Sequence, residues 1–256
     1  MAIIKTEAIV LNKFDFRETS IIAHFYTKDH GKISGLLKGI RKEPKKFAST
    51  LDLCSHNDII FYRKNNSTLH LVSQCDVKDS FNGIRTNIMK LGAVNMLLEL
   101  LAAIMPVEDA NKEVFDLSLE SLKEIDGRGD SEKILMIFKI KMLSLSGFKP
   151  HFDSCVSCGN KILGQSKFSV IIGGLLCPMC YNKDVKSRQI FRGTVATILH
   201  IEKNEFRDNL SLGMNPLIKK ELDFVLNSFL NFHLGKRLKS EAVMENLKRI
   251  DTEAGL

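Results

Sequence analysis

Residues 155–180 read CVSCGNKILGQSKFSVIIGGLLCPMC, with a Cys-x-x-Cys pair at each end and eighteen residues between the pairs. This spacing is typical of a structural zinc site, because each short Cys-x-x-Cys turn can direct two thiolates at one ion. Gly159 allows the left-handed backbone that such a turn often needs. The stretch KFSVII (167–172) predicts a strand, and Gly173-Gly174 predicts a turn into a second strand at Leu175-Leu176-Cys177, so the pattern between the pairs is a hairpin. The segment therefore predicts a zinc ribbon held by Cys155, Cys158, Cys177 and Cys180.

The four thiols favour a structural ion over a catalytic one. Four protein thiolates fill a tetrahedral coordination shell, whereas a catalytic zinc keeps one position open for water. The spacing does not distinguish zinc from iron. The alternatives are unrelated core cysteines or a redox dithiol, and a redox dithiol is expected at the start of a helix in a thioredoxin-like βαβ unit. The flanking sequence has no such pattern.

Helical periodicity flanks the predicted ribbon on both sides. Apolar residues recur at helical spacing over 88–105, before Pro106, and again in a helix expected to begin at Ser131. The same periodicity returns over 217–239. We therefore expect a zinc ribbon at 151–184, inserted between two parts of one helical domain, 81–150 and 185–256.

The first 80 residues have the features of short strands instead. SIIAHFYT (20–27) is rich in β-branched and aromatic residues, and the turn KDHG separates it from a strand expected at 32–37. Two further strands are expected at 59–62 and 69–72, separated by the turn KNNS. With a strand near the N-terminus this makes five, and a lone sheet of this size would leave its edges exposed. Residues 1–80 therefore predict a small closed or nearly closed β-barrel, and the whole chain a multidomain α+β protein.

The positive charge of the chain is concentrated in one run. The net charge is +7, and KISGLLKGIRKEPKK (32–46) alone holds six basic residues against the single acid Glu43. Clustered Lys and Arg on a loop of a small barrel neutralise phosphates and release their counterions, which favours a nucleic-acid partner. The alternative is a solvated face without a partner. Phe14 and Phe16 lie beside Lys13 and Arg17 in the first loop, and we expect these rings to be core or to plug the loop rather than to stack on bases.

The sequence favours a binding protein over an enzyme. It contains no G-x-x-x-x-G-K-[ST] phosphate loop, no G-x-G-x-x-G, no H-E-x-x-H and no G-x-S-x-G. Acidic pairs such as Glu108-Asp109 lie at expected helix ends, where capping and solvation account for them. The most apolar window is shorter than the roughly 20 residues that span a bilayer. With no secretory signal in MAIIKTEAIV, we expect a cytoplasmic protein.

Four segments together resemble the RecO family of bacterial recombination mediators. They are RETSIIAHFYTKDHGKISGLLKGIRK (17–42), KIKMLSLSGFKPHFDSCVSCGN (139–160), GGLLCPMC (173–180) and LNFHLGKRLKS (230–240). Their order and spacing carry the resemblance, which covers nearly the whole chain. It implies an N-terminal OB-fold at 1–80, a helical domain and an inserted zinc ribbon, and it implies that the protein is not an enzyme.

The resemblance also implies a function and partners. Members of the family bind single- and double-stranded DNA, anneal complementary strands and, with RecR, help RecA replace the single-strand-binding protein SSB. DNA contact by basic residues of the barrel maps by motif onto Lys38, Arg41 and Lys42. Charge extends the candidate DNA-binding set to Lys13, Arg17, Lys32, Lys45 and Lys46. The C-terminal tail of SSB is expected on the helical domain. The alternative reading is an OB-fold and zinc-ribbon RNA-binding factor.

Overall fold

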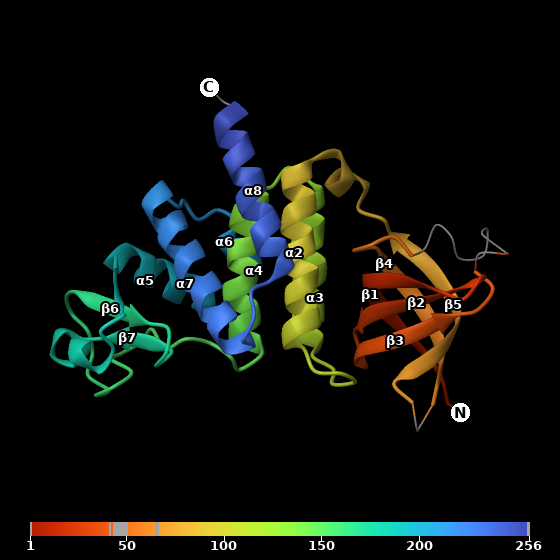
Figure 1. The fold of residues 1–256 in the computed structure, drawn as a ribbon, viewed down its shortest axis with the longest axis horizontal. Helices are drawn as coiled ribbons and strands as arrows, with labels where there is room; N and C mark the ends of the chain where they lie inside the picture. Colours follow the sequence, from red (N-terminus) through yellow and green to blue (C-terminus); the bar gives the residue numbers. More distant parts are fainter. Residues whose placement is uncertain (1, 41, 43–50, 65–66, 255–256) are drawn as a thin grey trace. The chain divides into compact units, whose positions relative to one another are not determined.

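The computed structural model describes residues 2–40, 42, 51–64 and 67–254 (Figure 1). The chain divides into two compact units, Met1–Ser131 with Ser240–Leu256, and Glu132–Lys239. The first unit contains the β-domain, two helices that follow it and the last helix. The second contains the four cysteines and the intervening helices. The division into 1–80, 81–150, 151–184 and 185–256 stays a prediction.

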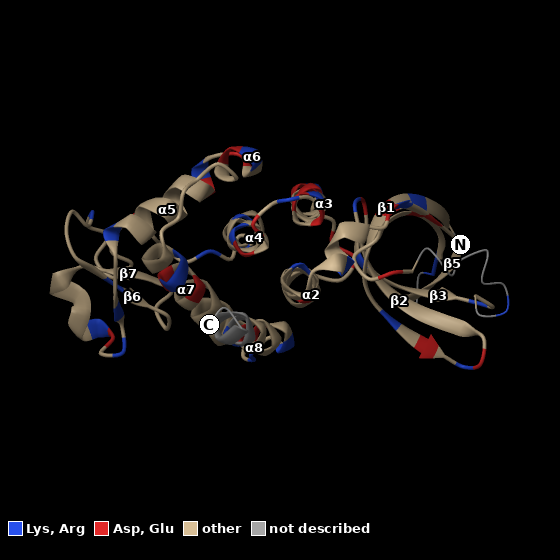
Figure 2. Cartoon of the chain, turned by 90° about the horizontal axis from the view of Figure 1, so that it is seen from above, with Lys and Arg blue, Asp and Glu red and all other residues tan. Residues whose placement is uncertain are grey.

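The N-terminal strands form a closed barrel, which confirms the predicted fold (Figures 1 and 2). Their order in the barrel is β1-β2-β3-β5-β4, and all neighbours are antiparallel except β3 and β5. The first strand is long enough to pair with β4 along its first half and with β2 along its second, so it closes the sheet on itself. The bounds are β1 Ala2–Phe16, β2 Ser20–Thr27, β3 Gly31–Leu37, β4 His56–Arg63 and β5 Leu69–Asp79.

Alternate side chains of these strands fill the barrel. The burial of β3 alternates strictly along the strand, as expected when one face of a strand is inside and the other outside. A shift of register between Val10 and Asn12 interrupts this alternation in β1. Gly35 lies where a Cβ atom would approach Val72 within 2.5 Å, so the interior has no room for a side chain there. The core is made of Ala8, Val10, Ala23, Phe25, Ile33, Leu37, Ile40, Leu51, Ile59, Phe61, Val72 and Cys75.

Three α-helices complete the first unit. Asn87 and Asn111 cap two of them by accepting hydrogen bonds from backbone N–H groups of the first turn. The last helix packs closely against the helix that Asn87 caps. A Cβ atom on Gly92 of that helix would lie 2.2 Å from the Met244 sulfur of the last helix. The elements are the short 3-10 helix η1 (Asn82–Thr86), α2 (Ile88–Ile104), α3 (Lys112–Asp126) and α8 (Lys239–Ala254).

One side of the barrel is covered by this helical part. The Tyr26 hydroxyl donates to the carbonyl of Asn111 (3.2 Å), and the Tyr26 and Phe115 rings lie 6.3 Å apart. Glu108, just before α3, binds both Arg63 (2.7 Å) and His70 (3.1 Å) of the barrel. These contacts determine which part of the outer wall of the barrel stays available to a partner.

The second unit contains a three-stranded sheet of order β7-β6-β8, in which both pairs are antiparallel. The sequence predicted the first two of these strands, whereas β8 adds a third. Gly173 turns the chain with φ +79°, a conformation that favours glycine. The elements are α4 (Ser131–Leu145), β6 (Ser166–Ser169), β7 (Gly174–Leu176), η2 (Pro178–Lys183), β8 (Arg188–Ile190), α5 (Arg192–Lys203), α6 (Phe206–Asn209) and α7 (Pro216–Leu234). Within the described ranges, none of the helices is both long and apolar enough to cross a membrane.

A carboxylate at the barrel wall collects three basic partners. Glu7 accepts hydrogen bonds from Lys28 (2.9 Å), Lys78 (2.8 Å) and His56 (2.9 Å). The hydrogen bonds from Lys78 and Lys28 lower the pKa of Glu7 from 4.5 to about 2. A group with a depressed pKa stabilises the fold above its unfolded pKa, and that contribution is lost as the pH falls through the folded value.

We expect Glu7→Gln to lower the free energy of unfolding at pH 7 by about 2 kcal/mol. This is less than the roughly 3 kcal/mol that corresponds to the full pKa shift, since solvent screens a partly exposed group. The deficit relative to the wild type should shrink between pH 4.5 and 2, where the wild-type carboxylate becomes protonated. Urea unfolding at a series of pH values measures this. Glu18→Gln, at an exposed turn position, is the control; an equal deficit in both variants would contradict the role given to Glu7.

Candidate metal centre and nucleic-acid interface

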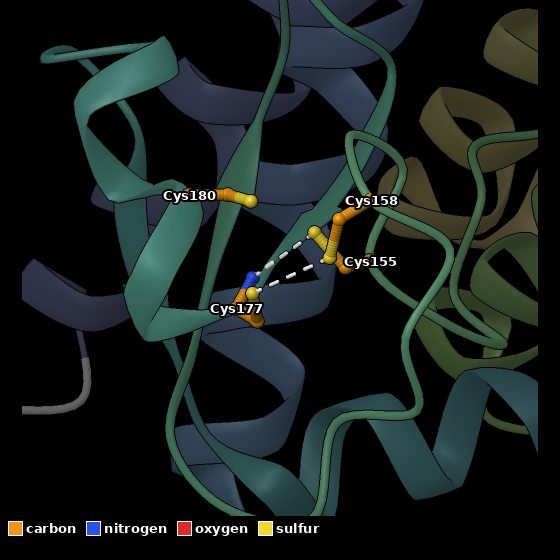
Figure 3. A group of neighbouring side chains, drawn as sticks. All are labelled: Cys155, Cys158, Cys177 and Cys180. Carbon is orange, nitrogen blue, oxygen red and sulfur yellow. Dashed lines mark hydrogen bonds between the residues drawn. The ribbon is translucent and has the colours of Figure 1, made fainter.

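The four predicted cysteines meet in the second unit. Cys155 and Cys158 precede β6, Cys177 directly follows β7, and Cys180 lies in η2. Their sulfur atoms all lie within 4.8 Å of one another, and the side chains point toward a common space (Figure 3). The Cys158 and Cys177 sulfurs are 3.8 Å apart. Zn–S bonds of about 2.3 Å in a tetrahedron place the sulfurs about 3.8 Å apart, so the donor set fits a single zinc-sized ion.

The backbone around the first cysteine pair supports this arrangement. Gly159 has φ +75°, which confirms the left-handed turn expected after the pair. Its N–H donates to the Cys155 carbonyl (2.8 Å), and the Cys155 N–H donates to the Asn160 carbonyl (2.9 Å). The Cys177 N–H donates to the Cys155 sulfur (3.4 Å) and so links the two pairs. These bonds orient the ligands toward one another in the manner of an outer coordination shell.

The thiols differ in how readily they ionise. Burial raises the pKa of Cys155, but N–H groups of Cys177, Cys158 and Ser157 outweigh it and lower that pKa to about 6. At Cys180 the Ser157 side chain lowers the pKa, whereas burial and the neighbouring thiols raise it, to about 12 overall. The protein alone thus favours the Cys155 thiolate, whereas it opposes ionisation of Cys180. Such a site releases protons when it binds a metal ion.

Four of the predicted DNA-binding residues gather at one end of the barrel. Arg17 lies in the turn between β1 and β2, and Lys13 lies three residues before Phe16, the last residue of β1. The register pairs Ile21 with Leu37, so Lys38 emerges beside that turn. The following turn places Lys42, whose N–H donates to the Gly39 carbonyl (2.9 Å). All four side chains are exposed, and we name this set the basic end: Lys13, Arg17, Lys38 and Lys42.

Lys32 is not part of the basic end. It pairs with Tyr26 at the opposite end of β3, and its ammonium group donates to the Ala102 carbonyl of α2 (2.5 Å). Burial lowers its pKa. The structure therefore uses Lys32 to join the barrel to a helix end. Arg41, Lys45 and Lys46 lie outside the described residues.

Carboxylates also lie at this end of the barrel, beside the basic end. Asp15 and Glu18 are exposed in the same hairpin as Lys13 and Arg17. Figure 2 shows basic and acidic residues side by side along the strands and loops of the barrel. The two signs balance within the hairpin, so the positive excess of this end comes from Lys38 and Lys42.

The rings of the first hairpin were expected to be core or to plug the loop, and for Phe14 the core position was wrong. Its side chain is 51% exposed, whereas Phe16 is half-buried with the Arg17 guanidinium 5.3 Å from its ring centre. The reason is the register shift between Val10 and Asn12. Val10 faces the core, and strict alternation would place Phe14 inside as well. The shift reverses the faces, and no local sequence signal marks it.

Comparison with known proteins connects both sites to one family. The family model Recombination protein O N terminal matches residues 1–81, and Recombination protein O C terminal matches residues 85–242. The chain is 30% identical to the DNA repair protein RecO of Syntrophus aciditrophicus, over 96% of each chain. It is 29% identical to that of Desulfatibacillum aliphaticivorans, over 96% of this chain and 98% of the relative. It is 30% identical to the DNA repair protein RecO of Alkaliphilus metalliredigens, over 91% of this chain and 95% of the relative.

Proposed function

The chain belongs to the RecO family of DNA repair proteins, and we propose that it is a recombination mediator that binds single- and double-stranded DNA and anneals complementary strands. In this proposal it acts with RecR to help load RecA onto single-stranded DNA that is coated with SSB. It works without catalysing a reaction, in the cytoplasm and at the nucleoid. The names of its relatives support DNA repair as the process.

The basic end is the observation that carries the proposal. Lys13, Arg17, Lys38 and Lys42 are exposed, and the register of three neighbouring strands brings them together. Cations in such a cluster neutralise phosphates and release counterions whatever the base sequence. Two strands held at one surface repel each other less and meet at a raised local concentration, which favours annealing. Arg41, Lys45 and Lys46 remain predicted contributors, whereas the ammonium group of Lys32 is bound to the Ala102 carbonyl.

We further propose that the bound metal is a structural Zn²⁺. Cys155, Cys158, Cys177 and Cys180 hold it, and it supplies a cross-link rather than a reaction centre. The support is the approach of the four sulfurs within 4.8 Å and the N–H bond from Cys177 to the Cys155 sulfur. A three-stranded sheet of this size buries too little apolar surface to be stable alone, so in this proposal the ion supplies its stability. Metal analysis of the purified protein distinguishes zinc from iron.

The proposed partners are reached through different parts of the chain. We assign DNA to the barrel and the C-terminal tail of SSB to the helical part. RecA is an indirect partner. Mobility-shift and annealing assays with and without SSB test this assignment. Annealing that is absent under all conditions, or binding that is confined to structured RNA, would refute the proposal and, in the second case, favour an RNA-binding factor.

Salt dependence is the sharpest test of the binding mode. Each phosphate contact to a single strand contributes about −0.7 to the slope of log K against log salt. The four described cations of the basic end therefore predict a slope of about −3 or steeper for an oligonucleotide. Fluorescence anisotropy between about 50 and 200 mM salt measures it. A slope near zero would mean that phosphate neutralisation does not drive binding.

A further inference from the structure

The outward-facing ring of Phe14 is a feature that phosphate binding does not require. The ring contacts His24 edge-on, with centroids 5.5 Å apart and planes at 74°. His24 is held in turn by a hydrogen bond between its Nδ1 and the Ser34 hydroxyl (2.8 Å). Phe14 is therefore supported on one side while half of its surface remains exposed. An exposed apolar side chain alone needs no explanation, so its surroundings decide whether it is a site.

Phe14 belongs to an apolar row on the outer wall of the barrel. The register places Ile22 opposite Phe14, Leu36 opposite Ile22, and Leu71 opposite Leu36. Ile22, Leu36 and Leu71 are half-buried, and neighbouring strands lie about 4.8 Å apart, so the row runs across four strands. We name these four residues the outer row.

A second part of the outer wall of the barrel is covered by the helix α3 and provides a comparison. Ile9 and Tyr26 are fully buried although neither belongs to the barrel core cluster. The ring of Phe115 from α3 lies 6.3 Å from that of Tyr26. The wall at Phe14 has no comparable cover among the described residues, since half of that side chain is exposed.

The charges around the outer row identify the kind of partner. Arg17, Lys38 and Lys42 lie at the end of the three strands that carry Phe14, Ile22 and Leu36. Lys13 and Asp15 flank Phe14 in β1, but successive side chains of a strand point to opposite faces, so both are expected on the face away from Phe14. An apolar surface bordered by cations matches a ligand with flat apolar faces and an anionic backbone. Single-stranded nucleic acid has both features.

We propose that Phe14 is a stacking platform for unpaired bases. In this arrangement a single strand of nucleic acid lies on the outer row, and the basic end binds the phosphates of that nucleic acid. This inference rests on the proposed function and deepens it. Duplex bases are already stacked on one another, so only single strands gain from the ring. The platform therefore gives the barrel a preference for single-stranded DNA that its charges alone do not provide. It also presents bases next to the cations that neutralise the phosphates of a second DNA strand.

A fluorescent reporter tests the contact directly. The chain contains no tryptophan, so Phe14→Trp introduces a single indole at the proposed platform. Saturation with a thymidine oligonucleotide should quench its emission, because the indole stacks on a base. An abasic oligonucleotide of the same length should bind without quenching. Phe232→Trp, on α7, is the matched control for an exposed aromatic position and should not respond. Equal quenching by the abasic strand would overturn the proposal.

Affinity measurements with Phe14→Ala complete the test. We expect a loss of about 10-fold for single strands, equivalent to about 1.4 kcal/mol, and no change for duplex or abasic DNA. Ile3→Ala, at an exposed apolar position near the other end of β1, should change neither. An equal loss on all three ligands would show a structural role for Phe14 and overturn the proposal. Unchanged affinity for single strands would also overturn the proposal. This includes a case in which Phe14→Ala abolishes binding of a protein partner instead.

A charge variant separates this failure from failure of the proposed function. If alanine at all four positions of the basic end weakens binding while Phe14→Ala does not, DNA binding stands and stacking is refuted. If neither change affects binding, the barrel is not the DNA-binding surface and both proposals fail.

Discussion

Cys155→Ser is expected to abolish stoichiometric metal binding and to unfold the ribbon. Cys155 is buried, its sulfur accepts an N–H bond from Cys177, and its pKa is the one lowered to about 6. The variant therefore removes the thiolate that the protein stabilises before any metal arrives. Apparent zinc-binding energies of structural sites are about 10–16 kcal/mol, far more than a three-stranded sheet gains from its own packing.

Three measurements follow this loss. Metal content of the purified variant should fall from about one ion per chain to a small fraction of that. Limited proteolysis should cut within 155–190 at protease levels that leave the wild type intact. A chelator should produce the same cleavage pattern in the wild type. Retention of both the metal and the protease resistance by Cys155→Ser would refute the assigned role.

Cys75→Ser provides the matched control. Cys75 is as deeply buried as Cys155, but it lies in the barrel core and not in the metal cluster. This substitution also exchanges a buried thiol for a hydroxyl, at a cost of about 1–3 kcal/mol. Its metal content should remain that of the wild type, so a difference between the two variants isolates metal ligation from simple burial.

Replacing the four residues of the basic end by alanine should weaken DNA binding by about 100-fold or more at low salt. The loss should be similar for unrelated base sequences, because phosphate contacts carry no sequence information. The salt slope for single strands should become shallower by about 0.7 for each lost contact. Strand annealing should fall in parallel. Anisotropy titrations over a salt series and a fluorescence-based annealing assay measure these effects.

The control for this variant removes the same charge elsewhere. Lys112, Arg128, Lys203 and Lys220 are exposed cations that do not belong to the basic end, and alanine at all four lowers the net charge equally. A comparable loss of affinity in both variants would show that overall charge, not the basic end, attracts DNA. Conversely, Cys155→Ser should keep its oligonucleotide affinity, because the barrel belongs to the other compact unit. These two results together would separate the metal site from DNA contact.

The metal site was the part of the molecule that the sequence predicted most completely. Both cysteine pairs, the left-handed Gly159 and the strand before Gly173 come from local patterns, because a Cys-x-x-Cys turn and a hairpin depend on few residues. The five strands of the barrel were also recognisable from composition and turns. The third ribbon strand, β8, was not, since its three residues carry no strand pattern of their own.

The nucleic-acid interface was predicted less well. Lys32 and Lys38 lie six residues apart in one basic run, yet they lie at opposite ends of β3, and Lys32 is bound to α2. Charge density along a sequence ignores that a strand rises about 3.3 Å per residue and so separates its own ends. Phe14 was expected to be core or to plug the loop, and its exposure could not be predicted because a one-residue register shift cannot be seen without the partner strand.

The sequence by itself determined the chemistry of this protein: four thiols for one ion, an excess of cations near the N-terminus, and strands followed by helices. Only the tertiary structure decided which residues act together. It brought β3 beside β5 in parallel to close the barrel, faced Phe14 outward, and joined the last helix to the unit that contains the barrel. The physical reason is the range of the interactions. Turn and ligand spacing are set within a few residues, whereas register, closure and exposure depend on partners far away in the chain.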